Sequence, residues 1–201
     1  MRRWAALAAV ACLLAAPAAR ADGDPASDYL LGTSAFIPAD ANVPGTDAKQ
    51  LRAVLAEANA RGFEIRVALI ASQYDMGSVG TLFLHPREYA RFLGQELFFV
   101  YKGRLLVVMP NGYGVSRGGK PLPSAQRIAG RLPRPGIDGH ALAGGATAAM
   151  RRIAAAEGIH LPLPRVAPAK SHSGDWLLIA VVGLVVVAAA AGTIVGRKRR
   201  A

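Results

Sequence analysis

Four residues have side chains that could take part in chemistry: Asp75, His85, Asp138 and His140. Asp75 follows the apolar segment 64–71, and ligand sites in α/β proteins usually lie at the carboxyl ends of strands. The alternative is a turn aspartate whose carboxylate accepts hydrogen bonds from nearby amides. His85 precedes Pro86 and could act as a general base or ligand, or pack against the start of a helix.

Asp138 and His140 are two residues apart and could act as an orienting carboxylate and a base. Asp138 is also a suitable N-cap for the helix that follows it. Ser116 lacks the strand–turn–helix context and the G-x-S-x-G spacing of a hydrolase nucleophile. The histidines are scattered singly, and no phosphate-binding glycine motif is present. We therefore assign no catalytic residue, no metal and no cofactor, and keep these residues as candidates only.

The distribution of charge is more informative than any motif. The net charge is +11, from 24 basic and 13 acidic residues. Residues 22–99 carry a net charge of −4, whereas residues 100–175 carry +8 and have no acidic residue from Leu97 to Ile137. This segment predicts either a solvated basic face or a surface for an anionic partner, such as phospholipid headgroups, an envelope polymer or an acidic protein. The predicted binding residues are Arg117, Lys120, Arg127 and Arg131.

Both ends of the chain predict membrane targeting. Residues 1–21 have the charged start, apolar core and small-x-small end of a signal peptide, and the alternative is an uncleaved anchor helix. Residues 176–196 form an uncharged segment long enough to span a bilayer, and the basic tail at 197–201 predicts a cytoplasmic C-terminus. A Pro/Ser/Gly-rich linker at 159–175 would join this span to an outer domain at 22–158. The expected location is the cell membrane of a bacterium, single-pass, with the N-terminal domain outside. No nucleic-acid partner is expected there.

The outer domain alternates between helical and strand patterns. Helices are predicted from Asp47 to Ala60 with Thr46 as N-cap, from Pro86 to Tyr101, from Pro123 to Leu132 and from Asp138 to Glu157. Strands are predicted over 64–71 and 104–109, and a turn at 110–112 would return the chain into a hairpin strand at 113–116. This alternation indicates an α/β fold with three layers around a sheet of short strands.

Four segments of this domain, in this order, resemble the TPM domain family over residues 29–157. They are the strand 65–70, the helix that carries Tyr89-Ala90 and Leu93, the strand Gly103–Val108, and Gly112-Tyr113-Gly114. The resemblance implies a Rossmann-like sandwich in an extracytoplasmic domain that is secreted or tethered by a membrane helix. It also implies accessory roles at membrane complexes, with phosphatase activity and metal binding in some members.

This sequence departs from the family pattern where acidic residues are common. The loop 31–38 contains no acidic residue, and Val115-Ser116-Arg117 follow the Gly-Tyr-Gly segment. Hard cations need several converging oxygen ligands, and these stretches supply few. We therefore expect a membrane-tethered interaction module without evident catalytic machinery. The alternative is a TPM-type phosphatase or hydrolase acting outside the cytoplasm.

Overall fold

The computed structural model of the chain describes residues 23–164. The predicted signal peptide, membrane span and basic tail lie outside the described residues, as does the linker beyond residue 164. Between residues 23 and 164, no helix has both the length and the apolar character needed to cross a membrane.

A five-stranded mixed sheet forms the centre of the domain. Its strands are β1 (Ala35–Phe36), β2 (Ile65–Leu69), β3 (Arg104–Met109), β4 (Gly112–Arg117) and β5 (Lys120–Pro121), and they lie side by side in sequence order. The first three strands are parallel, and β4 and β5 continue the sheet in antiparallel pairs. The hairpin β3–β4 has the predicted turn, with Met109 paired to Gly112.

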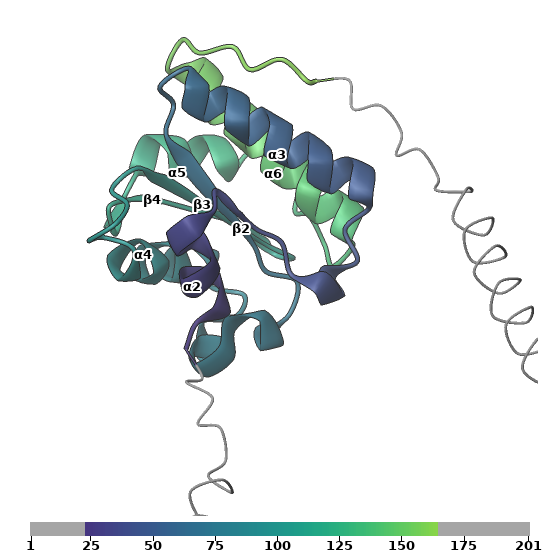
Figure 1. Cartoon of the computed structure of the whole chain (residues 1–201), viewed down its shortest axis with the longest axis vertical. Helices are drawn as coiled ribbons and strands as arrows, with labels where there is room; N and C mark the ends of the chain where they lie inside the picture. Colours follow the sequence, from purple (N-terminus) through teal and green to yellow (C-terminus); the bar gives the residue numbers. More distant parts are fainter. Residues whose placement is uncertain (1–22, 165–201) are drawn as a thin grey trace, which may run out of the picture. The chain divides into compact units, whose positions relative to one another are not determined.

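Helices cover both faces of this sheet, as Figure 1 shows. α3 (Gly45–Ala60), α5 (Pro123–Ala129) and α6 (Gly139–Ala156) pack on one face. α2 (Pro25–Gly32), α4 (Pro86–Glu96) and the 3-10 segment η2 (Gln73–Leu82) pack on the other. The prediction of an α/β fold with a central sheet of short strands is confirmed.

The alternation of side chains along β2 and β3 explains why both faces need helices. In β3, Leu106 and Val108 point to the core under α3 and α6, whereas Leu105 and Val107 point to the core under α4. All four side chains are buried. A strand with apolar residues on both faces must be covered on both faces. The sequence predicts this two-sided burial for the segment 104–109.

The two parallel connections have opposite hands. Each connection moves one strand in the same direction across the sheet, from β1 to β2 and from β2 to β3. The helix of the first connection, α3, lies on one face, and the helix of the second, α4, lies on the other. One of the two therefore departs from the right-handed connection that almost all parallel strands adopt.

Several predicted helix ends are wrong. α3 begins at Gly45 after Pro44, so Thr46 lies inside the helix and is not its N-cap. α4 ends at Glu96, because the chain turns sharply there: the amides of Val100 and Tyr101 both donate to the carbonyl oxygen of Leu97. α5 ends at Ala129 and not at Leu132. α2 and η2 were not predicted.

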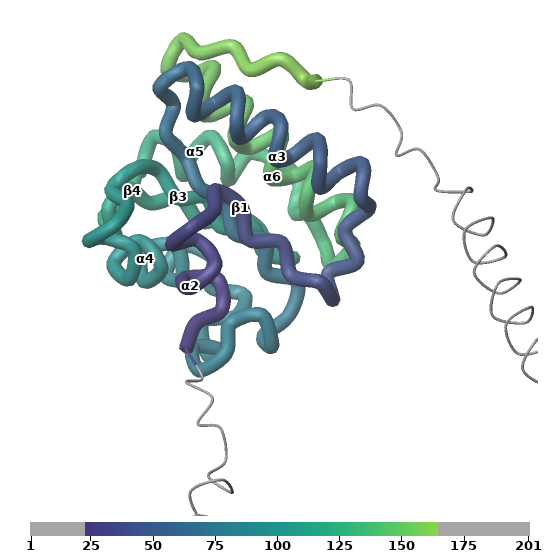
Figure 2. Tube along the Cα trace, in the orientation of Figure 1, coloured from purple at the N-terminus to yellow at the C-terminus, as the bar shows by residue number. Residues whose placement is uncertain are grey.

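The segment after α6 belongs to the domain. Leu161 is buried, Ile159 packs against the core, and the guanidinium of Arg151 donates to the carbonyl oxygen of Leu161 at 2.8 Å. Figure 2 shows this segment returning along α3 and α6. The predicted linker therefore begins later than residue 159, because these apolar residues cover the ends of the helices.

Gly114 lets α4 approach the sheet closely. A Cβ atom at Gly114 would lie 1.7 Å from the carbonyl oxygen of Pro86, in the first turn of α4. Gly112 has a positive φ of 148° at the hairpin turn, a backbone conformation that side chains disfavour. Gly114 therefore serves the packing of α4 on β4, and Gly112 serves the hairpin turn.

Candidate functional site

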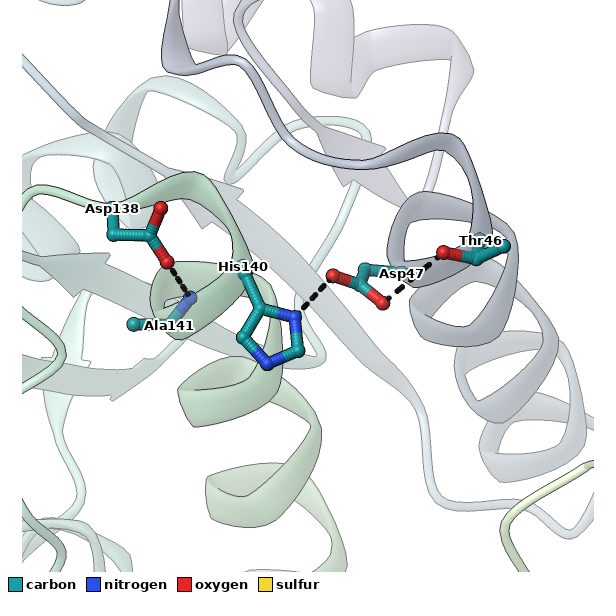
Figure 3. Close-up of polar contacts among 5 residues, drawn as sticks. All are labelled: Thr46, Asp47, Asp138, His140 and Ala141. Carbon is teal, nitrogen blue, oxygen red and sulfur yellow. Dashed lines mark hydrogen bonds and ion pairs between the residues drawn. The ribbon is translucent and has the colours of Figure 1, made fainter.

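His140 forms a pair with Asp47, which the sequence analysis did not single out. Nδ1 of His140 lies 2.6 Å from Oδ2 of Asp47, and Thr46 donates its hydroxyl to the other carboxylate oxygen at 3.4 Å (Figure 3). Asp47 lies in the first turn of α3, and His140 lies in the first turn of α6. The two helices run side by side, so residues 93 positions apart meet at their N-terminal ends.

The carboxylate of Asp47 raises the pKa of His140 by accepting its hydrogen bond and by its negative charge. The imidazole ring is 73% exposed, whereas the Asp47 side chain is largely covered. A hollow of about 230 Å³ lies beside the pair, lined also by Gln50, Thr147 and Arg151. Because Nδ1 faces Asp47, the Nε2 atom is left for a ligand or a proton transfer.

Asp138 and Asp75 both hold backbone amides. Asp138 is the N-cap of α6, and its carboxylate accepts from the amide of Ala141 at 3.0 Å, as Figure 3 shows. Asp75 accepts from the amides of Ala71 and Ser72 at 2.7 and 2.8 Å. Burial, with a contribution from the nearby carboxylate of Asp40, raises the pKa of Asp75 to about 6. Both aspartates thus take the capping role that was their alternative interpretation.

Ser116 and His85 lie apart from the His140–Asp47 pair. Ser116 is fully buried in β4, and its hydroxyl donates to the carbonyl oxygen of Ala90 in α4 at 2.5 Å. This bond ties the helix to the strand and leaves no access for a substrate. His85 is exposed at the start of α4 and lines a hollow of about 420 Å³ there. The structure therefore does not bring the candidate residues into one site.

A basic groove follows the outer side of α4. Three hollows of about 420, 310 and 450 Å³ adjoin one another, since Glu88 lines all three and Arg87 and Arg91 each line two. We call them together the α4 groove. Its charged linings are the basic residues Arg87, Arg91, Lys120 and Arg134 and the acidic residue Glu88. Glu88 approaches only Arg91 within ion-pair distance, at 3.9 Å.

The predicted binding residues are all exposed but do not all line this groove. Lys120 lines it, and Arg117 is paired with Lys120 in the β4–β5 register. Arg127 lies on α5, whereas Arg131 lies in the turn after the helix, because α5 ends at Ala129. The spacing of four residues between them therefore does not place both on one helix.

Two groove residues, Arg87 and Arg91, were missed by the sequence analysis. They are four residues apart in α4, and that spacing puts them on one side of a helix. This spacing can be read from the sequence, but both residues precede the segment 97–137, the stretch without acidic residues on which the prediction of a basic surface rests. Asp47 had no comparable signal, since only the packing of α3 on α6 brings it to His140.

The described chain is an α/β domain with a polar pair at one site and a basic groove at another. Within residues 23–164, no three His, Cys, Asp or Glu side chains are placed to hold a metal ion. Comparisons with protein-family models, with curated proteins and with solved structures find no match. The resemblance to the TPM domain family stays a prediction.

Proposed function

We propose that the chain is a membrane-tethered interaction module of the bacterial envelope, which binds an anionic partner outside the cytoplasm through the α4 groove and the neighbouring basic residues. The tether is the predicted span at 176–196, and the signal peptide at 1–21 would deliver the domain to the outside. We also propose that the layered fold is a Rossmann-like variant of the TPM type. Three parallel strands with helices on both faces support this, although the strands follow in sequence order.

The observation that carries the proposal is the imbalance of charge along the α4 groove. Four cations line it and only one carboxylate does, in the part of the chain that the structure describes. Arg87 and Arg134 both line the hollow of about 420 Å³, and neither pairs with a carboxylate among the described residues. A groove in which one sign of charge predominates raises the local concentration of ligands with the opposite sign.

Charge reversal tests this proposal. The full chain would be used as bait in a pull-down from solubilised membranes, with Arg87→Glu and Arg134→Glu combined in one variant. We expect this variant to lose most partner binding, and we expect wild-type binding to weaken as salt is raised. A second variant, Arg127→Glu with Arg131→Glu, measures how far the binding surface extends beyond the groove.

The matched control reverses two cations on the opposite face of the sheet. Arg52 in α3 and Arg152 in α6 are both exposed. Their double reversal changes the net charge by the same amount and should leave binding intact. If all three double variants bind like the wild type with the same salt dependence, the basic groove is a solvated surface and the proposal fails.

The tether is tested separately by topology. A reporter fused after Ala201 should report a cytoplasmic location, and one inserted at 166–174 should report an external one, because the basic tail fixes the orientation. The opposite pattern would place the domain in the cytoplasm and would overturn the envelope assignment.

A hydrolase is the second candidate, and the His140–Asp47 pair is the observation that favours it. A carboxylate that orients an imidazole is the arrangement of a general base, and the adjoining hollow also presents Arg151, a cation for an anionic substrate. The reaction would be the hydrolysis of a phosphoester. Nε2 of His140 would take a proton from a water molecule whose oxygen attacks phosphorus, and the P–O ester bond would break so that the alcohol leaves with that proton. The side chain of Thr147 also lines this hollow and adds a hydroxyl group to it.

Hydrolysis of p-nitrophenyl phosphate by the full chain tests this candidate. If His140 is the base, His140→Gln should lower the rate about 100-fold or more, and Asp47→Asn should shift the pH profile to lower pH. Arg152→Gln, a change outside the hollow, is the control. A wild-type rate equal to that of His140→Gln would remove the hydrolase candidate and leave the interaction module.

A further inference from the structure

Three consecutive apolar residues after α4 are exposed on a well-defined turn. Phe99 is 94% exposed, Val100 60% and Phe98 41%. We call these three residues the aromatic tip. They interrupt a segment whose flanking side chains are covered: Leu97 before them is fully buried, and Tyr101 after them is half-buried.

The turn that carries the aromatic tip is held by several contacts. The amides of Val100 and Tyr101 donate to the carbonyl oxygen of Leu97 at 2.9 and 2.7 Å. The hydroxyl of Tyr101 donates to the carbonyl oxygen of Arg104 at 2.8 Å, and the guanidinium of Arg66 stacks over the Tyr101 ring at 4.2 Å. The exposure of the tip is thus built into the fold.

Cations surround the aromatic tip. The ammonium group of Lys102 lies 4.8 Å from the centre of the Phe98 ring. The same ring faces the β4–β5 turn, since a Cβ atom at Gly118 would lie 3.7 Å from it. That turn carries Arg117 before it and Lys120 after it, and both are exposed. Carboxylates also lie at this end of the domain. The negative charge of Glu64 raises the pKa of Tyr101, Glu96 is in the last turn of α4, and Glu157 pairs with Arg104.

We propose that the aromatic tip docks on an anionic phospholipid bilayer, with the Phe99 and Val100 side chains in the interface and Lys102, Arg117 and Lys120 on the headgroups. Exposed aromatic residues next to basic ones are the composition of surfaces that lie in a membrane interface. The patch is small. From the exposed fractions it presents roughly 400 Å² of surface, against about 800 Å² per partner in a stable protein complex. Its size and its charge therefore suit a lipid surface better than a second copy of the chain.

The predicted tether lets the aromatic tip reach the bilayer. Eleven residues separate Pro164 from the predicted span that begins at Trp176, and they can extend to at most about 40 Å. A domain of 142 residues is roughly 35–40 Å across. The tether is thus long enough for the tip to face the membrane, whichever way the domain turns. This inference rests on the proposed tether but not on the α4 groove.

Lipid quenching of a label at the tip tests the inference on the full chain. With Cys12→Ser as background, an environment-sensitive fluorophore is attached at Phe99→Cys or, as a matched control, at Ile137→Cys. Ile137 is also strongly exposed, at 80%, but lies in a different loop. The chain is reconstituted in vesicles of phosphatidylcholine, with or without phosphatidylglycerol, and with nitroxide quenchers on the lipid tails. Thermal unfolding of both labelled chains checks that they fold alike.

We expect the label at position 99 to lose roughly half of its emission in anionic vesicles, because interfacial residues lie about 5–10 Å into the headgroup–acyl boundary. The label at 137 should stay unquenched. Lys102→Gln should lower the ratio of docked to undocked domain about fivefold. The Arg87→Glu, Arg134→Glu variant should not change it, which separates docking from binding in the α4 groove.

Three results would overturn the proposal. A chain that floats with the vesicles but is not quenched at position 99 refutes docking and leaves the tether standing. A label at 99 that shifts to the blue without lipid quenching indicates contact with protein, such as a second copy of the chain. A chain that does not float with the vesicles refutes the tether and the docking together.

Discussion

The acidic and the basic parts of the described domain differ in what their charged side chains contact. Residues 23–99 contain 9 acidic and 6 basic residues, and residues 100–164 contain 2 acidic and 9 basic ones. In the first part, three of the five aspartates make contacts within the domain. Asp24 accepts from the Tyr89 hydroxyl, Asp75 holds two amides, and Asp47 pairs with His140.

In the second part, most basic side chains make no such contact within the domain. Arg104 pairs with Glu157, and Arg151 donates to the carbonyl oxygen of Leu161. The seven others form no ion pair within residues 23–164: Lys102, Arg117, Lys120, Arg127, Arg131, Arg134 and Arg152. Acidic residues that serve as caps are required by the fold, whereas cations left in water are available to a partner. We therefore look for structural effects in the first group and binding effects in the second.

The largest expected effect lies in the packing beneath the α4 groove. In Gly114→Ala, the new Cβ would meet the carbonyl oxygen of Pro86, so α4 must move away from β4. Because backbone atoms cannot give way as a flexible side chain does, we expect a loss of about 3 kcal/mol in the free energy of unfolding. Urea unfolding of the detergent-solubilised full chain measures this loss.

Gly144→Ala is the matched control for this change. Gly144 lies in α6 with no atom within 4 Å of its Cβ position. The same substitution should stabilise the chain there by about 0.5–1 kcal/mol, because alanine is the better helix former. Equal effects at both glycines would mean that the close approach of α4 to β4 does not support the groove.

A smaller difference in stability is expected between the loss of a capping carboxylate and the loss of a solvated cation. Asp138→Ala removes the cap on the Ala141 amide and should cost about 1 kcal/mol. Arg127→Ala should change stability by no more than about 0.5 kcal/mol, because Arg127 is exposed and has no ion pair among the described residues. Thermal unfolding of the two variants side by side measures the difference. A larger loss in Arg127→Ala would contradict the division drawn above.

The sequence predicts the features that depend on local pattern. The apolar run 104–109 indicates a strand covered on both sides, and Asp138 stands where a cap is needed. The β3–β4 turn, whose central residues are Pro110 and Asn111, falls within the turn predicted at 110–112. Each of these needs only the chemistry of neighbouring residues, so no knowledge of the fold is required.

Features that depend on packing could not be predicted in this way. The pair of His140 and Asp47 exists because α3 and α6 lie side by side, and no pattern links residues that far apart. The opposite hands of the two connections go against the usual rule, so the sequence pattern favours the wrong arrangement for one of them. The sequence did not predict the exposed aromatic tip, because Leu97 and Val100 have the spacing of apolar residues in a helix that continues to Tyr101.

The smallest expected effect is on the pH dependence of the His140–Asp47 pair. Asp47 raises the pKa of His140 above the ordinary value of about 6.5. The folded chain therefore holds this proton more tightly than the unfolded chain. The stabilisation is complete at pH values below the ordinary pKa, and it is lost as the pH rises through the raised pKa. Because the ring is largely exposed, the effect on stability is slight and is better detected by titration.

Titration of the histidine rings by NMR on the full chain measures this directly. The wild type should show a raised pKa for His140, and Asp47→Asn should return it to the ordinary value because the neighbouring negative charge is gone. Asp138→Asn is the control, because the Asp138 carboxylate contributes least among the causes of the shift, and it should leave most of the increase in place. If Asp47→Asn leaves the His140 titration unchanged, the pair does not form in solution. Asp47 would then count among the exposed charges, and the acidic part of the domain would resemble the basic part more closely than its contacts indicate.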